Sequence, residues 1–220
     1  MYILYGGGVT RALGPQMVLE EGNFPYELRK VDITKQEHRA EAFVKLNPAG
    51  YIPALITPEG DVLHEAAAIM LYLADRHGLT DLAPATDDPL RGVFLSRLFY
   101  FTNDVQPSFK RTYYARRYAL RDEDTAAVAA QSEAMVRDRW QVIEDQLAAN
   151  GPYQLGERFS LLDIHLAMWA AYGFRKPGDL LDAMPASKVL FDRVMARPKC
   201  GALLQALMDE IAGFRQTMKR

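Results

Sequence analysis

The chain has 220 residues, of which 49% are hydrophobic and 25% charged, proportions typical of a globular protein with one or two domains. Its 26 basic and 28 acidic residues give a net charge of −2, which offers no support for electrostatic binding of nucleic acid. The single cysteine, Cys200, excludes an intrachain disulfide and a cysteine-based zinc site, and no apolar stretch approaches the ~20 residues that span a membrane. We therefore expect a cytoplasmic protein without a metal site.

The first 81 residues alternate short strand patterns with short helix patterns. Pro15 suits the first turn of a helix, and Asn47-Pro48 ends another because the residue before proline avoids the helical conformation. The predicted elements are, in chain order, a strand at 2–5, a helix at 15–21, a strand at 26–32, a helix at 37–46, strands at 54–57 and 61–63, and a helix at 65–77. This order predicts a small mixed sheet with helices packed on it.

A polar, proline-containing linker follows at residues 82–89, and strand patterns then nearly vanish. The helices predicted after it cover residues 90–118, 124–149, 161–173, 187–196 and 200–216. Residues 90–220 are therefore expected to form an all-α domain. Ser160 and Asp163 have the spacing of a capping box at the start of the helix predicted from residue 161, so we assign Asp163 a structural role.

Two short motifs in the first domain favour a binding function. Pro53 cannot donate to a sheet ladder, so it belongs at a strand start or turn, where the main chain of Ile52 could pair with an extended peptide. The helix predicted from Glu65 follows a strand directly, and the free amides of its first turn, at Ala66 and Ala67, can bind an anion such as a carboxylate.

In sequence, these motifs resemble the glutathione transferase superfamily, and most closely its bacterial beta-like branch. The resemblance covers nearly the whole chain, and the segments that carry it are Leu19-Glu-Glu-Gly22 with Pro25-Tyr-Glu27, Asn47-Pro-Ala-Gly-Tyr-Ile-Pro-Ala-Leu55, Leu63-His-Glu-Ala-Ala-Ala-Ile69 and Phe159-Ser-Leu-Leu-Asp163. It implies an α/β thioredoxin-like N-terminal domain at 1–81, an all-α C-terminal domain that lines the co-substrate pocket, and a homodimer.

The resemblance also implies how the first domain binds glutathione. It implies that Pro53 is cis and that Ile52 pairs its main chain with the cysteinyl unit. Glu65 and the amide of Ala66 would hold the γ-glutamyl end. Lys35 would lie near the glycyl carboxylate.

A second group of implied residues belongs to the helical domain. Asp104, with Asn103, would reach the glutathione of the partner subunit. Gln106 stands where beta-class relatives have a histidine, which is one departure from the family pattern.

The segment Gly8-Val9-Thr10-Arg11-Ala12 stands where beta-class proteins have Cys or Ser. The sequence therefore offers two other candidates for the residue that activates the thiol. Thr10 is our first candidate for a hydroxyl donor to the thiolate, with Arg11 adding positive potential. Tyr5 is the second candidate, although a core aromatic in a buried strand has the same pattern. Ala66 replaces the serine that most relatives use to bind the glutamyl carboxylate.

We therefore expect a glutathione transferase-like enzyme that activates the thiol of glutathione for attack on a small apolar electrophile. The alternative is a non-catalytic protein of the same fold that binds or scaffolds. Glutathione-dependent disulfide reduction would need a nucleophilic cysteine, and Cys200 is badly placed for it. The basic, aromatic stretch from Lys110 to Arg121 is expected to be a solvated helix face or part of the co-substrate pocket rather than a nucleic-acid site.

Overall fold

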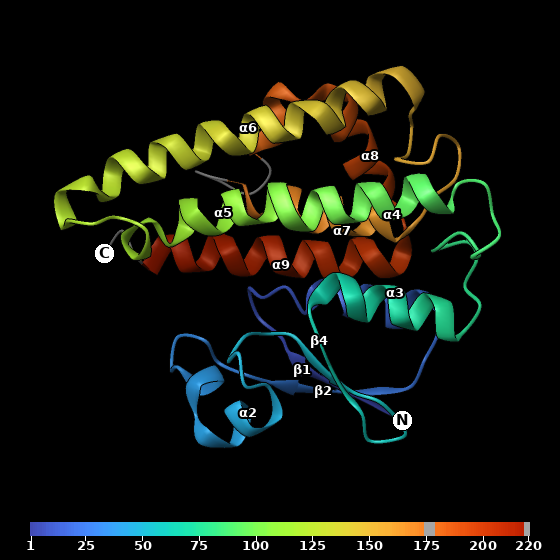
Figure 1. Ribbon diagram of the computed structural model, residues 1–220, viewed down its shortest axis with the longest axis horizontal. Helices are drawn as coiled ribbons and strands as arrows, with labels where there is room; N and C mark the ends of the chain where they lie inside the picture. Colours follow the sequence, from blue (N-terminus) through green and yellow to red (C-terminus); the bar gives the residue numbers. More distant parts are fainter. Residues whose placement is uncertain (174–178, 218–220) are drawn as a thin grey trace.

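The computed structural model describes residues 1–173 and 179–217. The N-terminal domain is a four-stranded sheet of order β2-β1-β3-β4, beneath a layer of longer helices (Figure 1). Its strands are β1 (Tyr2–Gly6), β2 (Tyr26–Lys30), β3 (Ala54–Ile56) and β4 (Val62–His64). β2 runs parallel to β1, whereas β3 and β4 are antiparallel to their neighbours. The mixed sheet expected from the sequence is confirmed.

Helices cover both faces of this sheet. α1 (Leu13–Glu21) and α3 (Ala66–Arg76) pack together on the face toward the helical domain, and α2 (Glu41–Leu46) lies on the other (Figure 1). The side chains of β1 alternate between these two faces. On one face the Tyr2 hydroxyl lies 2.7 Å from His77, the residue directly after α3, whereas on the other the ring of Tyr5 packs against Phe43 of α2. The helix predicted over 37–46 is divided, because Ala40 is extended between a 3₁₀ turn and α2.

The C-terminal domain is helical, as predicted. Its α-helices are α4 (Arg91–Tyr100), α5 (Gln106–Tyr113), α6 (Thr125–Asn150), α7 (Leu161–Tyr172), α8 (Pro185–Met195) and α9 (Pro198–Thr217), and 3₁₀ turns lie at Glu37–Arg39 in the first domain and at Ala115–Arg117, Asp122–Asp124 and Asp179–Ala183 here. α7 is buried along its whole length and forms the centre of this domain. None of the helices in the described part of the chain is long and apolar enough to cross a membrane.

The single helix predicted over 90–118 is interrupted. A π-helical turn, Phe101–Val105, separates α4 from α5. Pro107 lies in the first turn of α5 and has no amide proton to donate to the preceding turn, which favours a change of hydrogen-bond pattern there. The interruption places Asn103 and Asp104 on an irregular, exposed turn.

The two domains are joined through α1 and α3, which pack against α7, while α1 also contacts α9. Arg197, just before α9, donates two hydrogen bonds to the Glu21 carboxylate at the end of α1, at 3.2 and 2.5 Å. The buried Cys200 thiol donates to the same carboxylate at 3.2 Å. These contacts hold the C-terminal end of α1 against the helical domain. The loop between β1 and α1, which precedes the other end of this helix, forms one wall of a pocket.

Candidate functional site

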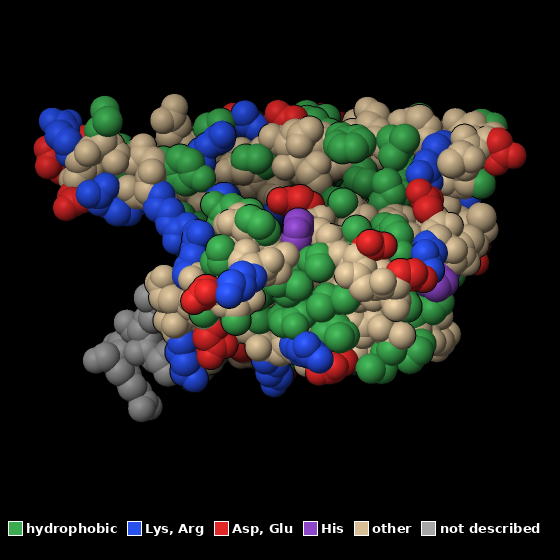
Figure 2. All heavy atoms as spheres, turned by 60° about the horizontal axis from the view of Figure 1, so that its bottom comes forward, with side chains coloured by type: hydrophobic (Ala, Val, Ile, Leu, Met, Phe, Trp, Pro, Cys, Tyr) green, Lys and Arg blue, Asp and Glu red, His purple; other side chains and the backbone are tan. Residues whose placement is uncertain are grey.

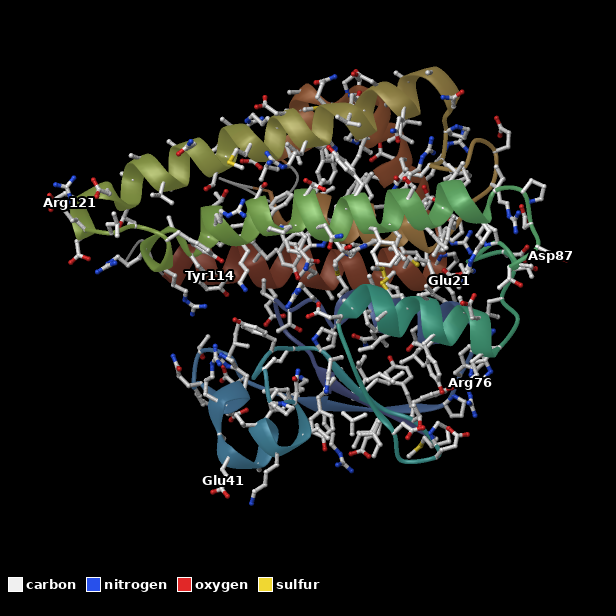
Figure 3. The ribbon with its side chains drawn as sticks, in the orientation of Figure 1. Glu21, Glu41, Arg76, Asp87, Tyr114 and Arg121 are labelled. Atoms are coloured by element: carbon white, nitrogen blue, oxygen red, sulfur yellow. The ribbon has the colours of Figure 1, made fainter. Side chains whose placement is uncertain are left out.

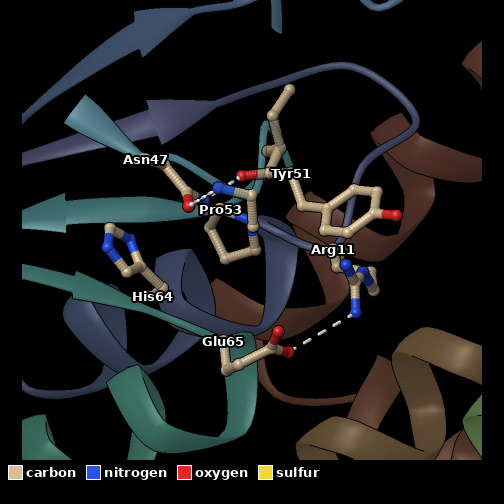
Figure 4. A pocket seen from close by; sticks show the side chains of 8 residues that line it. Arg11, Asn47, Tyr51, Pro53, His64 and Glu65 are labelled. Atoms are coloured by element: carbon tan, nitrogen blue, oxygen red, sulfur yellow. Dashed lines mark hydrogen bonds and ion pairs between the residues drawn. The ribbon is translucent and has the colours of Figure 1, made fainter. Parts of the chain in front are cut away.

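A pocket of roughly 230 Å³ opens where the loop after β1, the turn before β3 and the start of α3 meet (Figure 4). Its lining residues are Arg11, Asn47, Ala49, Tyr51, Ile52, Pro53, His64 and Glu65. The pocket therefore unites four residues expected from the sequence, which come from three separate segments: Arg11, Ile52, Pro53 and Glu65. The other expected residues lie outside this lining.

The turn before β3 is shaped by a cis peptide bond between Ile52 and Pro53, as the family resemblance implied. The buried side chain of Asn47 supports the turn: its amide donates to the Tyr51 carbonyl at 2.6 Å, and its oxygen accepts from the Ala49 amide at 3.2 Å. Ile52 is buried beside Pro53, so its main chain is held at the pocket wall.

The start of α3 forms the opposite wall. Glu65 has a positive φ of 66°, a conformation that costs energy for a residue other than glycine and that often marks functional sites. No side chain caps α3, so the amides of its first turn remain available to an anion. The Glu65 carboxylate, 65% exposed, lies 3.8 Å from the guanidinium of Arg11. Ala66, the first residue of α3, is buried beside this arrangement.

The loop after β1 orients Thr10 and Arg11 differently. Gly7 and Gly8 have φ values of 85° and 62°, which only glycine adopts freely, and the Thr10 hydroxyl donates to the Gly7 carbonyl at 2.9 Å. Since a hydroxyl has one proton, Thr10 has no second one to offer to a ligand, and it is only 7% exposed. Arg11 instead lines the pocket, so it is better placed than Thr10 to contact a ligand there.

Tyr5 and Lys35 are not among the residues that line the pocket. The Tyr5 hydroxyl accepts a hydrogen bond from Arg29 at 2.8 Å on the sheet face that carries α2. Lys35 is exposed and lies 3.4 Å from the carboxylate of Asp32. Neither side chain is brought to Glu65 or Pro53 in the single chain.

Four lining residues were quoted in the sequence motifs without a role in binding: Asn47, Ala49, Tyr51 and His64. The ring of Tyr51 has the Lys110 ammonium 4.5 Å from its centroid, so this residue joins the pocket to α5. The charge of Lys110, with that of Arg39, lowers the pKa of the Tyr51 phenol. His64 has its Nδ1 atom buried, without a hydrogen-bond partner among the residues that the structure describes. The pairing of Tyr51 with Lys110 has no sequence signal, because the two residues lie in different domains.

Several titratable groups with strongly shifted pKa values lie elsewhere. Burial raises the pKa of Asp163 to about 7, and its carboxylate accepts from the Ser160 and Gln154 amides at 2.7 and 2.8 Å. The capping box predicted at Ser160 and Asp163 is confirmed. Burial also raises the pKa of the Cys200 thiol, which keeps it protonated. Within residues 1–173 and 179–217, no three His, Cys, Asp or Glu side chains are grouped as a metal site would need.

Comparison with known proteins identifies the same two halves. The family profiles described as glutathione S-transferase, N-terminal domain, and glutathione S-transferase, C-terminal domain, match residues 11–76 and 103–198. The chain is 29% identical to the disulfide-bond oxidoreductase YfcG of Escherichia coli, over 88% of this chain and 90% of that protein. It is 32% identical to glutathione S-transferase 3 of Zea mays, over 82% of each. A crystal structure of a glutathione transferase from Methylococcus capsulatus matches with a TM-score of 0.79 and 28% identity, over 94% of this chain and 98% of that one.

Proposed function

Because the chain belongs to the glutathione S-transferase superfamily, we propose that it binds glutathione in this pocket and activates the glutathione thiol for transfer to an electrophile. The main chain of Ile52 pairs with the cysteinyl unit. Glu65 binds the α-amino group, and the amide of Ala66 binds the α-carboxylate. One observation carries the proposal: the cis-proline turn, the uncapped start of α3 and the Arg11 guanidinium all meet at one pocket.

The thiol needs positive potential to ionise at neutral pH, since its ordinary pKa is about 8.5. Arg11 supplies this potential from the pocket wall, with Glu65 as its nearest acidic partner. Thr10 acts indirectly, because its hydrogen bond to Gly7 holds the loop that presents Arg11. No general base is required, because the thiol proton passes to solvent when the thiolate forms.

In the transfer step, the thiolate forms a bond to an electrophilic carbon of the second substrate, and the leaving group departs with its electron pair. The ring of Tyr51, which lines the pocket together with Arg11, suits the apolar body of such a substrate.

The relationship to the E. coli oxidoreductase favours a second candidate, the reduction of a disulfide. Cys200 is the sole cysteine and is buried against Glu21, so glutathione itself would provide the sulfur. One glutathione thiolate attacks the disulfide and releases one thiolate, and a second glutathione attacks the mixed disulfide to release the other. The substrate is reduced to two thiols, and two glutathione molecules are oxidised to one disulfide.

Binding and catalysis are tested separately. Glutathione at 100 times its Kd adds ~2.7 kcal/mol to the stability of the folded state, so the Tm should rise by about 5–10 °C. Glu65→Gln should reduce this shift, whereas Glu59→Gln, which alters an exposed pair with Arg76, should not. No shift and no calorimetric binding would contradict the glutathione site.

The activity assays then distinguish the candidate functions. Turnover of chlorodinitrobenzene supports the transferase, and turnover of hydroxyethyl disulfide supports the reductase. Binding of glutathione without either activity would favour the non-catalytic alternative, with which the replacement of serine by Ala66 is consistent.

A further inference from the structure

A group of cations surrounds Tyr51 at the mouth of the pocket. The Lys110 ammonium lies 4.5 Å from the centroid of the Tyr51 ring, and the Arg39 guanidinium carbon lies 5.3 Å from it. Lys110 belongs to α5 of the helical domain and Arg39 to the 3₁₀ turn before α2. The Tyr51 ring therefore makes a cation–π contact with one residue from each domain, and these contacts stabilise the positions of the Lys110 and Arg39 side chains.

Arg117 extends this group. Its guanidinium carbon lies 4.3 Å from the centroid of the Tyr114 ring, just after α5. Burial lowers the pKa of His38, and the charges of Arg39 and Arg117 act on it in the same direction. We call Arg39, Lys110 and Arg117 the cationic rim.

The cationic rim lacks acidic partners. No carboxylate of the described residues pairs with any of its three members, although three other basic residues of the region are paired. Arg116 is bound to Asp122, Arg121 to Asp124, and Arg11 to Glu65. Figure 3 places Tyr114 toward the end of the helical layer and Arg121 at the tip that projects beyond the sheet domain, and Figure 2 shows Lys and Arg side chains along that end. Three neighbouring cations without counter-charges form a site for an anion.

We propose that the electrophile carries an acidic group, such as a carboxylate, and that Lys110 and Arg117 bind this group while the apolar body of the electrophile lies against the ring of Tyr51. This inference rests on the proposed function. Arg39 lies across the turn that carries Ala49, on the glutathione side, and one cation suffices for the glycyl carboxylate of glutathione. The two cations from the helical domain remain for the second substrate.

A small anion fits the surroundings better than nucleic acid. Asp122 and Asp124 pair with Arg116 and Arg121 on either side of Arg117 in the sequence, so the positive surface is short. The chain as a whole has a net charge of −2. A basic surface that tracks a polyphosphate backbone needs a longer stripe of unpaired cations.

The test uses two stable conjugates that share the glutathione part, S-benzylglutathione and S-(para-carboxybenzyl)glutathione, titrated by calorimetry into the whole protein. We expect the carboxylated conjugate to bind about five- to twentyfold more tightly, because its carboxylate accepts a charge-assisted hydrogen bond from the cationic rim. Lys110→Gln and Arg117→Gln should each reduce this preference severalfold and leave the affinity for S-benzylglutathione unchanged. Arg116→Gln is the matched control, since Arg116 is paired with Asp122, and it should leave the preference intact.

The outcomes separate this inference from the function on which it rests. Binding of neither conjugate would overturn the glutathione site and the inference together. Equal affinities for the two conjugates, or a preference that survives both substitutions, would overturn the inference alone. An equal loss of affinity for both conjugates and for glutathione in Lys110→Gln would assign Lys110 to the glycyl carboxylate and would also overturn it.

Discussion

Arg11 and Thr10 are adjacent in the chain, yet their side chains have different surroundings. Arg11 faces the pocket and Glu65, whereas the Thr10 hydroxyl is bound to Gly7. We expect Arg11→Gln to lower turnover about a hundredfold and to raise the pKa of bound glutathione, because a charge that stabilises the thiolate is removed. Thr10→Val should lower turnover only about fivefold, the effect of one ordinary hydrogen bond.

The measurement is the pH dependence of turnover together with the thiolate absorbance of bound glutathione. Tyr5→Phe serves as the control, since it removes only the contact with Arg29, and it should leave both unchanged. Loss of activity in Thr10→Val with a normal Arg11→Gln would make the Thr10 hydroxyl the donor, as the sequence first indicated. Loss of activity in Tyr5→Phe would assign that role to Tyr5.

Ala66 provides a second prediction at this scale. It is the first residue of α3 and follows the strained Glu65, so a hydroxyl there would lie beside the α-carboxylate of bound glutathione. Ala66→Ser should tighten glutathione binding severalfold to a hundredfold, since one hydrogen bond contributes ~0.5–1.5 kcal/mol and up to ~3 with a charged partner. Calorimetry on wild type and variant measures the change. Ala68→Ser, an exposed position in the same turn, is the control, and equal binding in all three proteins would place the carboxylate elsewhere.

At the scale of single elements, α7 depends on a buried carboxylate. The pKa of Asp163, about 7 in the folded protein, exceeds the ~3.9 of an exposed aspartate. The folded state therefore holds this proton more tightly, and the stability that depends on it falls as the pH rises from about 4 to about 7.

Asp163→Asn removes this titration, and an asparagine oxygen cannot accept from both the Ser160 and Gln154 amides with ideal geometry. We expect a loss of at least ~2 kcal/mol and a flatter dependence of the unfolding free energy on pH in that interval. Denaturation at several pH values measures it. Asp192→Asn, which alters an exposed pair with Lys188, should differ little from wild type, and parallel pH curves for Asp163→Asn and wild type would contradict the shifted pKa.

The start of α8 depends on a residue of α6. The buried Glu144 carboxylate accepts from the Ala186 amide at 2.7 Å, from the Ser187 amide at 2.8 Å and from the Ser187 hydroxyl at 2.7 Å. Glu144→Gln leaves at least one of these buried donors without an acceptor. We expect a loss of about 2–4 kcal/mol, seen as a Tm lower by about 5–10 °C. Glu133→Gln, in a half-buried i,i+4 pair on the same helix, should cost less than ~0.5 kcal/mol; an equal loss would mean that the α8 contact contributes little.

At the scale of the whole molecule, α4 exposes an apolar surface beside the turn that carries Asp104. Val93 is 43% and Phe99 56% exposed. Because large exposed apolar side chains can mark interfaces, we predict a two-fold dimer that forms over α4 and buries Phe99. Sedimentation at micromolar concentration should show a dimer for wild type and a monomer for Phe99→Glu.

Val189→Glu is the control for this prediction, since Val189 is 49% exposed on α8, away from α4. If Asp104 reaches the partner's glutathione, Asp104→Asn should weaken glutathione binding in the dimer and have no effect in the monomeric Phe99→Glu background. A monomeric wild-type protein would remove both the interface and the role of Asp104.

The order of the elements and most of their bounds were predictable from the sequence, because hydrophobic periodicity and proline or glycine signals act over a few residues. The Ser160–Asp163 capping box was also predictable, from residue spacing alone. The cis peptide bond between Ile52 and Pro53 was implied by the family resemblance. The divided helix at Ala40 and the π-helical turn before Pro107 were missed, since each depends on a competition between local hydrogen-bond patterns.

What only the tertiary structure decided is which polar groups remain available at the pocket. Spacing could not show that the Thr10 hydroxyl is bound to Gly7, or that Tyr5 faces α2, because side-chain direction depends on what packs around each residue. The contact of Lys110 with Tyr51 and the carboxylate of Glu144 at α8 join segments distant in the chain, and such contacts form only when the helical domain packs against the sheet. Sequence motifs thus determined where the pocket lies, while packing between the domains determined which charges line it and which remain unpaired.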